Sequence, residues 1–338
     1  MTAVPPTLEF TVDRDLHGIR IDTFLSYHLR NYTRWRLARI VRAGGTKIDF
    51  GPVDETRRVA RGERVQVTLF EPPDKLLLPQ PIELPLVYSD NWILVIDKPA
   101  GLIAHPTGEY QTGTLINALQ HILNAQTALP GLLRPGVVHR LDRQTSGLMV
   151  VAAQHRSHML LSAAFEQGRV SKTYLALVEG TVSEDHGSID LPIGRTRYGR
   201  GILMSARADA VDRKPACTRF RVIERYPQHT LVEARPQTGR NHQIRVHFAH
   251  IGHPLVGDEF YLARGAIRSE RSAIRARRSG LEAEIGGVLA EEEDDDSLGR
   301  HMLHAARLEF AHPISDLWMT FTAPLPQDFC ERIAAVSS

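Results

Sequence analysis

The stretch that decides the fold runs from Val137 to Ala152, with the sequence VVHRLDRQTSGLMVVA. Two apolar runs, 136–138 and 148–153, are rich in β-branched residues and predict short buried strands. The polar segment between them predicts a loop, and it holds a single acid, Asp142, with arginines close on both sides. Active sites often lie in such loops at the end of a strand, although a lone loop acid more often pairs with a neighbouring arginine at the surface.

The composition is that of a globular intracellular protein. A chain of 338 residues has room for about two domains and a sizeable core. Two cysteines, Cys217 and Cys330, are too few for a disulfide scaffold and favour a reducing, cytoplasmic location. No apolar run approaches the ~20 residues that span a membrane, and the N-terminus lacks the features of a signal peptide. The net charge is only +2, so any nucleic-acid signal must come from local clusters of charge.

One such cluster lies near the N-terminus. The apolar spacing predicts helices over 21–29 and 33–42, the second with Thr33 as its N-cap, followed by strands over 46–49 and 64–70. This region carries a cationic face made of Arg34, Arg36, Arg39, Arg42 and Lys47. Such a face is typical of nucleic-acid binding, in which it neutralises phosphates and supplies affinity with little sequence choice. The alternative is a basic helix that only faces solvent.

A proline-rich stretch follows and predicts a stiff linker. Beyond it, predicted strands and helices alternate without a regular βαβ repeat, which favours a mixed, largely antiparallel sheet with flanking helices. Helices are predicted near 115–123 and 158–166, and the strands 216–225 and 230–235 are close enough to form a hairpin. The segment 264–300 departs from this pattern, because it begins with scattered arginines and ends with six consecutive acids. We expect an insertion there that is mostly disordered or partly helical, either a tolerated surface loop or a contact for RNA or protein.

Further motifs accompany the Asp142 stretch in a fixed order over about residues 87–326. They are Asp97-Lys98-Pro99-Ala100-Gly101-Leu102 with His105-Pro106, 113–119, Lys172-Thr173-Tyr174, 238–247, Gly252-His253-Pro254 with Gly257-Asp258 and Tyr261, Leu303-His304-Ala305, and His312-Pro313. Together with His139-Arg140-Leu141-Asp142, they resemble the RluA family of RNA pseudouridine synthases, whose members modify uridines in ribosomal and transfer RNA.

The resemblance implies an α+β fold, with the pseudouridine-synthase sheet and a small N-terminal S4-like α/β domain. Gly18-x-Arg20-x-Asp22-x-x-Leu25 is similar to the opening of an S4-type RNA-binding domain. The predicted organisation is therefore an S4-like domain over 12–71, a linker over 72–86 and a catalytic domain over 87–330. The resemblance favours large-subunit ribosomal RNA over transfer RNA as the partner, with a monomeric enzyme acting on it.

The resemblance also implies the chemistry. The reaction breaks the bond between ribose C1′ and uracil N1 and rejoins the base through C5, so no cofactor or metal is expected. Asp142 would attack C1′ or remove the C2′ proton, and the sequence leaves both routes open. Arg245 would keep that carboxylate ionised, and Tyr174 would stack on the base or serve near C5. The expected RNA- and base-binding residues of this pocket are Arg140, Gly239, Arg240, His242 and Gln243, while Asn241 replaces the usual Thr or Ser.

Two alternatives from other classes are weighed against this hypothesis. A cluster of histidines, His242, His247, His250 and His253, invites a zinc-hydrolase interpretation, but no acid or cysteine joins it with ligand spacing. A catalytically silent RNA-binding protein would be expected to lack Asp142, Tyr174 or Arg245, and all three are present.

Overall fold

The computed structural model describes residues 5–74, 77–105, 112–127, 130–196, 203–267 and 299–337. Most of the segment 264–300, predicted to be an insertion, lies outside these residues, so that prediction is not tested. None of the helices in the described part of the chain is long and apolar enough to cross a membrane.

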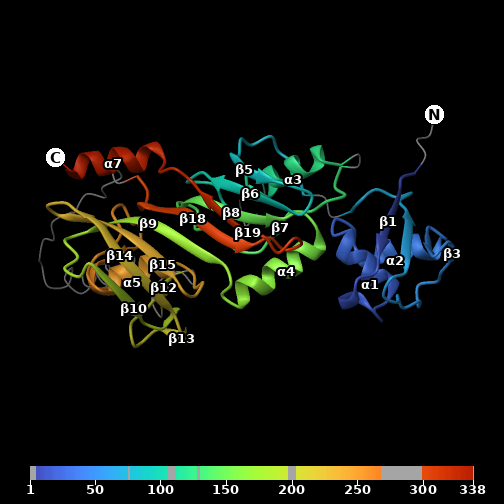
Figure 1. Cartoon of the computed structure of the whole chain (residues 1–338), viewed down its shortest axis with the longest axis horizontal. Coiled ribbons are helices and arrows are strands. Elements are labelled where there is room, and N and C mark those ends of the chain that lie inside the picture. The colour runs from blue at the N-terminus through green and yellow to red at the C-terminus, as the bar shows by residue number, and fades with distance from the viewer. Residues whose placement is uncertain are drawn as a thin grey trace, which may run out of the picture.

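The N-terminal unit packs two helices on a small sheet, and Figure 1 shows it at one end of the elongated molecule. The helices are α1 (Ile21–His28) and α2 (Arg34–Arg42), and Arg14–Leu16 forms a short 3₁₀ turn. Thr33 caps α2 as predicted, because its hydroxyl accepts the Arg36 N–H at 3.2 Å. The sheet has the order β1-β4-β2-β3, with strands β1 (Thr7–Thr11), β2 (Thr46–Ile48), β3 (Gly51–Pro52) and β4 (Arg64–Thr68).

A buried amide joins this unit to the rest of the chain. The fully buried Asn31 side chain donates to the Gly131 carbonyl at 2.7 Å, and Arg134 donates to the Arg30 carbonyl at 3.2 Å. Leu132 also packs against the N-terminal core. Because a buried amide is costly without partners, these contacts hold the two units in one relative position.

A ten-stranded sheet forms the larger unit. Its main path runs β10-β14-β15-β9-β18-β8-β6-β5, with β19 beside β18 and β7 beside β8. Only the β18–β8 pair is parallel among these described strands, so the sheet is mixed and largely antiparallel, as predicted. The strands are β5 (Leu86–Ser89), β6 (Ile93–Lys98), β7 (Gly136–Val137), β8 (Ser146–Ala152), β9 (Ser171–Glu179), β10 (His186–Asp190), β14 (Cys217–Arg225), β15 (His229–Pro236), β18 (Leu303–Ala311) and β19 (Trp318–Thr322).

Helices cover both faces of this sheet. Along β6, Leu94 and Ile96 pack in a core with α3 (Leu115–Ala125) and α5 (Gln243–His250). Their neighbours Ile93 and Val95 face the opposite core, which contains α4 (His155–Glu166). Since successive side chains of a strand alternate between faces, a sheet covered on both sides needs continuous apolar runs such as 148–152. A C-terminal helix, α7 (Gln327–Ser337), buries Phe329 against the β9 side of the sheet.

Smaller elements complete the fold near α5. A three-stranded sheet contains β11 (Ile193–Arg195), β12 (Met204–Ser205) and β13 (Val211–Lys214), and a two-stranded one contains β16 (Tyr261–Leu262) and β17 (Ala266–Ile267), linked by a 3₁₀ turn over Ala263–Gly265. The predicted start of α4 at 158 is wrong by one turn. The helix begins at His155, because Ser157 accepts the Gln154 N–H at 3.3 Å and caps the first turn.

Candidate active site

The Asp142 loop lies between β7 and β8, and buried contacts with the core hold its backbone. Leu141 packs in the core, and the Thr145 N–H donates to the Asp142 carbonyl at 3.1 Å. The fully buried Lys98 ammonium donates to the carbonyls of Pro99 at 2.8 Å, Arg143 at 3.0 Å and Leu102 at 3.2 Å. Burial, together with the positive charge of Arg300, lowers the pKa of Lys98 to about 7.

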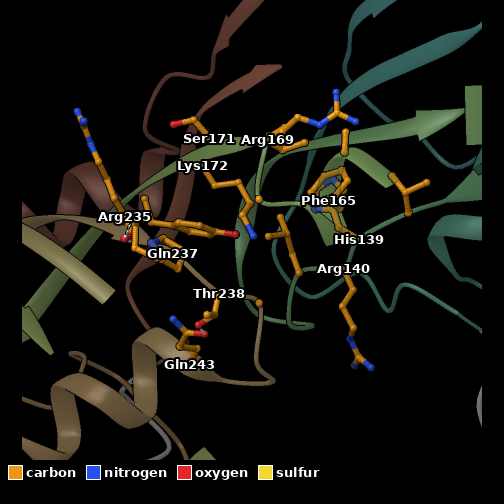
Figure 2. Close-up of a pocket in the computed structure, with 18 of the residues that line it drawn as sticks. His139, Arg140, Phe165, Arg169, Ser171, Lys172, Arg235, Gln237, Thr238 and Gln243 are labelled. Carbon is orange, nitrogen blue, oxygen red and sulfur yellow. Dashed lines mark hydrogen bonds between the residues drawn. The ribbon is translucent and has the colours of Figure 1, made fainter. Parts of the chain in front are cut away.

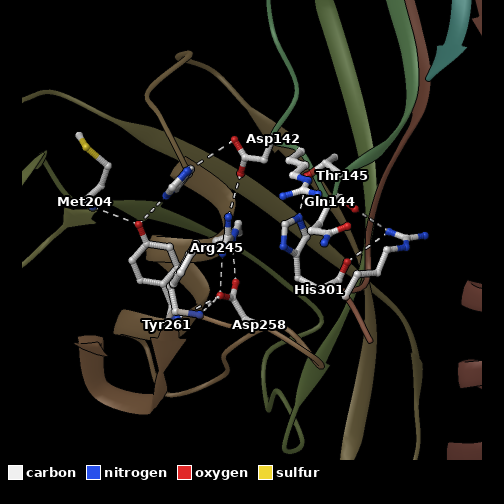
Figure 3. Close-up of polar contacts among 12 residues, drawn as sticks. Asp142, Gln144, Thr145, Met204, Arg245, Asp258, Tyr261 and His301 are labelled. Carbon is white, nitrogen blue, oxygen red and sulfur yellow. Dashed lines mark hydrogen bonds and ion pairs between the residues drawn. The ribbon is translucent and has the colours of Figure 1, made fainter. Parts of the chain in front are cut away.

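Arg245, on α5, holds the Asp142 carboxylate. Its Nη1 lies 3.2 Å from Asp142 Oδ2, while its Nε and Nη2 bind the two oxygens of Asp258 at 2.7 and 2.8 Å (Figure 3). The bidentate bond to Asp258 fixes the plane of the guanidinium, so its remaining nitrogen points at Asp142. The rings of Phe260 and Tyr261 also lie against the guanidinium, 5.4 and 5.1 Å from its carbon.

The environment of Asp142 favours its charged form. Burial opposes ionisation, but the facing His242 and Arg245 outweigh it and hold the pKa of Asp142 below its ordinary value. Burial lowers the pKa of His242, so its ring is neutral at neutral pH and Arg245 supplies the positive charge that persists there. Asp142 is therefore an ionised carboxylate in a largely enclosed site.

The His242 ring lies beside that carboxylate. The Tyr261 hydroxyl accepts the Met204 N–H at 3.0 Å and lies 2.6 Å from His242 Nδ1. Donation of the Tyr261 proton to Nδ1 would place the imidazole proton on Nε2. That Nε2 lies 3.8 Å from Asp142 Oδ1. His242 starts α5 in a left-handed conformation, with φ of 53°, which turns its ring toward the loop.

The far side of the loop is held by the segment after residue 299. His301 Nε2 lies 2.8 Å from the Thr145 hydroxyl, and burial lowers the pKa of His301 to about 3, so this ring is neutral. Arg300 donates to the Gln144 carbonyl at 3.1 Å and binds Asp328 of α7 at 2.6 and 3.1 Å. These contacts brace the Asp142 loop against the C-terminal helix.

A cavity of about 1260 Å³ opens beside this cluster (Figure 2). It is lined by all eight residues predicted for this pocket, namely Arg140, Asp142, Tyr174, Gly239, Arg240, His242, Gln243 and Arg245. Tyr174 comes from β9, and burial and the charge of Asp142 raise the pKa of its hydroxyl, which therefore stays protonated. The Gln243 amide binds the Thr238 hydroxyl, the Arg240 N–H, the Cys217 carbonyl and the Thr218 hydroxyl, and so fixes the loop beside the cavity.

The predicted N-terminal cations lie away from this cavity and are mostly paired. Arg34 binds Asp22, Arg39 binds Glu71 and Arg42 binds Glu55, while Arg36 lies 3.6 Å from Glu71 and 3.3 Å from Asp74. Lys47 is exposed and carries no ion pair within the described ranges. Surface pairs of this kind contribute little and exchange readily for other anions.

The histidines do not converge on one point. His247 bonds to Thr218 and the Leu191 carbonyl, whereas His253 bonds to the Glu179 carbonyl. No group of three metal-binding side chains occurs in the part of the chain that the structure describes. Four residues near the cavity had no role assigned from the sequence, namely Lys98, Lys172, Asp258 and His301. Lys98, Asp258 and His301 are held by hydrogen bonds to Arg143, Arg245 and Thr145, whereas Lys172 lies beside the Phe165 ring. Lys98, Lys172 and Asp258 lie within the sequence motifs of the family, and this position was the signal that could have identified them.

Comparison with known proteins gives a consistent family. Residues 92–250 match the RNA pseudouridylate synthase family. The chain is 34% identical to the uncharacterized RNA pseudouridine synthase YlyB of Bacillus subtilis, over 96% of this chain and 97% of that protein. It is 37% identical to ribosomal large subunit pseudouridine synthase D of Pseudomonas aeruginosa, over 93% and 91%, and 38% identical to that of Xanthomonas campestris, over 94% and 89%.

The fold agrees with this result. Human RNA pseudouridylate synthase domain containing 4 has a similar structure, with a TM-score of 0.54 and 24% identity, over 75% of this chain and 92% of that one. The α+β fold predicted from the motifs is therefore confirmed. The chain belongs to the RluA family and is an RNA pseudouridine synthase.

Proposed function

We propose that this enzyme isomerises uridine in the RNA of the large ribosomal subunit, and that Asp142 starts the reaction. The choice of RNA is supported by the relatives named for the large ribosomal subunit, which are about as long as this chain. The role of Asp142 is supported by one observation above all. Its ionised carboxylate sits in the cavity, held by a guanidinium that Asp258 fixes in place.

In the proposed reaction, Asp142 acts at the sugar and Tyr174 at the base. The carboxylate attacks C1′ or takes the C2′ proton, and either role requires the charge that Arg245 maintains. The Tyr174 ring offers a flat surface for the uracil, and its protonated hydroxyl lies within the same cavity. A uridine inside folded RNA must leave its stack to reach this site, and the exposed Arg140 at the cavity rim can take its place.

The N-terminal unit is proposed to hold the RNA by its phosphates. The proposed domain limits are 12–71 for this S4-like unit, 72–86 for the linker and 87–330 for the catalytic unit. The arginines of α2 and the exposed Lys47 supply the positive charge, and RNA phosphates can replace the carboxylates that now pair with them.

The test is to map pseudouridines in ribosomal and transfer RNA from a deletion strain and its parent. We expect a loss confined to large-subunit ribosomal RNA, restored by the wild-type gene but not by Asp142→Asn. A loss confined to transfer RNA would overturn the choice of substrate and leave the reaction itself unaffected.

A further inference from the structure

Lys172 is a cation inside the cavity without an anionic partner. It lies two residues before Tyr174 on β9, so both side chains project from the same face of the strand. Figure 2 shows it extending into the middle of the pocket, between Phe165 and His139 on one side and Thr238 on the other. Its ammonium lies 5.8 Å from the centre of the Phe165 ring. Over the residues that the structure describes, no carboxylate and no hydrogen-bond acceptor lies within bonding distance of it.

The surroundings of Lys172 do not neutralise its charge. His139 accepts the Val150 N–H at 3.0 Å, and burial and the nearby Lys172 charge lower the pKa of His139 to about 3, so that ring is neutral. A methyl group placed on Gly239 would sit 3.9 Å from Lys172 Nζ, so the ammonium reaches across to the opposite wall. An ammonium that is partly removed from water and left without a partner costs free energy, which a ligand carrying negative charge would offset.

The other cations of the cavity are committed or stand at its rim. Arg245 is occupied by Asp142 and Asp258, and Arg240 donates to the Pro215 carbonyl at 3.0 Å. Exposed side chains at the mouth of the cavity include those of Arg140, Arg169 and Arg219. Backbone phosphates are strongly hydrated and fit such a rim, whereas Lys172 points to where the uracil would stack on Tyr174.

Resting on the proposed function, we propose that Lys172 is a catalytic residue that stabilises the negative charge of the detached uracil. When the C1′–N1 bond breaks, its electron pair leaves with the base, and the charge spreads over N1, O2 and O4. Asp142 meanwhile either forms a bond to C1′ or takes the C2′ proton. In the return step C5 bonds to C1′ as the Asp142–C1′ bond breaks, or as Asp142 returns the proton to C2′. C5 then loses its proton and N1 gains one. The sum is an isomerisation, with no external reactant.

An ammonium suits this task better than a guanidinium. Its charge is compact, its three donors rotate, and its stem is flexible, so it can follow an anion that turns over between leaving and rejoining. Preorganised charge of this kind acts on the state in which the negative charge develops and has little effect on binding of the neutral uridine.

The test uses the full-length enzyme and a large-subunit ribosomal RNA fragment that the wild-type enzyme converts. Rates are measured in single turnovers with saturating enzyme for Lys172→Met and Lys172→Arg. Lys214→Met serves as the matched control, because this exposed lysine of β13 is outside the cavity lining. The fragment is also prepared with 5-fluorouridine at the target, since fluorine withdraws electrons and makes the uracil a better anion. Because C5 of this base has no proton to lose, the rate on both RNAs is measured as disappearance of the target nucleoside, which reports cleavage of the C1′–N1 bond.

For Lys172→Met we expect a saturated rate lower by about a hundredfold, with little change in RNA affinity. Lys172→Arg should recover part of the rate, and Lys214→Met should match the wild-type enzyme. The deficit of Lys172→Met relative to the wild-type enzyme should shrink on the fluorinated RNA. For each protein, the rate on fluorinated RNA is divided by the rate on unmodified RNA, and this ratio does not depend on how much of the protein is folded. Equal deficits on both RNAs would overturn the proposal. The proposal would also be overturned if Lys172→Met kept the wild-type saturated rate but bound RNA more weakly, with a salt slope lower by about one ion. Lys172 would then be a phosphate contact. If the wild-type enzyme converts no ribosomal fragment, the proposed substrate fails instead.

Discussion

The most consequential single residue is Asp142, because its charge depends on a chain of two other side chains. Asp258 binds the guanidinium through two bonds, and this leaves one nitrogen of Arg245 for Asp142. The arrangement separates two tasks. Asp258 is fully paired and positions the cation, whereas Asp142 keeps an oxygen that faces His242 and the cavity.

Replacing Asp142 with Asn preserves its shape and removes its charge. We expect a folded protein that binds RNA and forms pseudouridine at least about 10³-fold more slowly, as is usual when an essential group is lost. Single-turnover conversion of a substrate RNA measures the rate, and circular dichroism checks the fold. Activity within tenfold of the wild-type enzyme would contradict the proposed role.

Replacing Arg245 with Ala should change the pH dependence of the reaction. Asp142 works in its ionised form, and its pKa is held low, so the wild-type rate falls only well into the acid range. Removing the cation raises that pKa, because burial is then unopposed, and the acid limb of the pH–rate profile moves to higher pH. Arg245→Lys restores the charge without the planar fork and should recover part of the rate. Since Ala also leaves Asp258 buried and unpaired, at a cost of about 3–5 kcal/mol, rates are compared per folded molecule. A saturated rate equal to wild type at every pH would exclude the pairing from the chemistry.

At the scale of elements, Gly147 lies where β8 pairs with β18. It adopts φ of 114°, and a Cβ there would collide with the backbone of Ala305, its parallel partner in β18. This glycine therefore belongs to the strand pairing as well as to the loop that carries Asp142.

We expect Gly147→Ala to lower the free energy of unfolding by several kcal/mol, through both strain and collision. Gly168→Ala is the matched control, because Gly168 has φ of 67° with nothing within 4 Å of the added carbon. That change should cost only about 1 kcal/mol, from backbone strain alone. Urea denaturation of both variants gives the comparison. Equal losses would show that β8 and β18 can separate at this point.

At the scale of elements, the structure also shows which features could be predicted from the sequence. The start of α2 at its Thr33 cap and the β14–β15 hairpin were predictable, because spacing and caps are local signals. The start of α4 was missed, since a Gln at an N-cap is not a strong signal. At the site, the motifs place Asp142 and Arg245 in one pocket. The bond between Arg245 and Asp258 depends on a turn that spacing does not reveal, and His301 meets Thr145 across 156 positions of sequence.

At the scale of the whole molecule, the N-terminal unit is fixed to the larger one by the Asn31 amide, and its basic helix carries paired arginines. We expect deletion of residues 1–75 to leave a folded catalytic unit, because the two units have separate cores. The truncated enzyme should bind RNA more weakly and with a shallower dependence of affinity on salt. Binding titrations over a range of salt concentrations measure the slope.

Lys47→Ala in the full chain is the single-site comparison and should lower the slope by about 0.9. An unchanged slope after the deletion would mean that the basic helix only faces solvent.

The place of β18 in the sheet has a consequence for the order in which the enzyme is made. Strands β5, β6 and β8 form one half of the sheet, β9, β15, β14 and β10 form the other, and β18 lies between the halves. Asp142 belongs to the first half, whereas Tyr174 and the helix of Arg245 belong to the second. A ribosome synthesises residues 303–311 after all three. Until that strand emerges, no strand pairs with both halves, so the sheet that aligns the carboxylate with its cation is incomplete. A nascent chain therefore holds every reacting group long before it holds an active site.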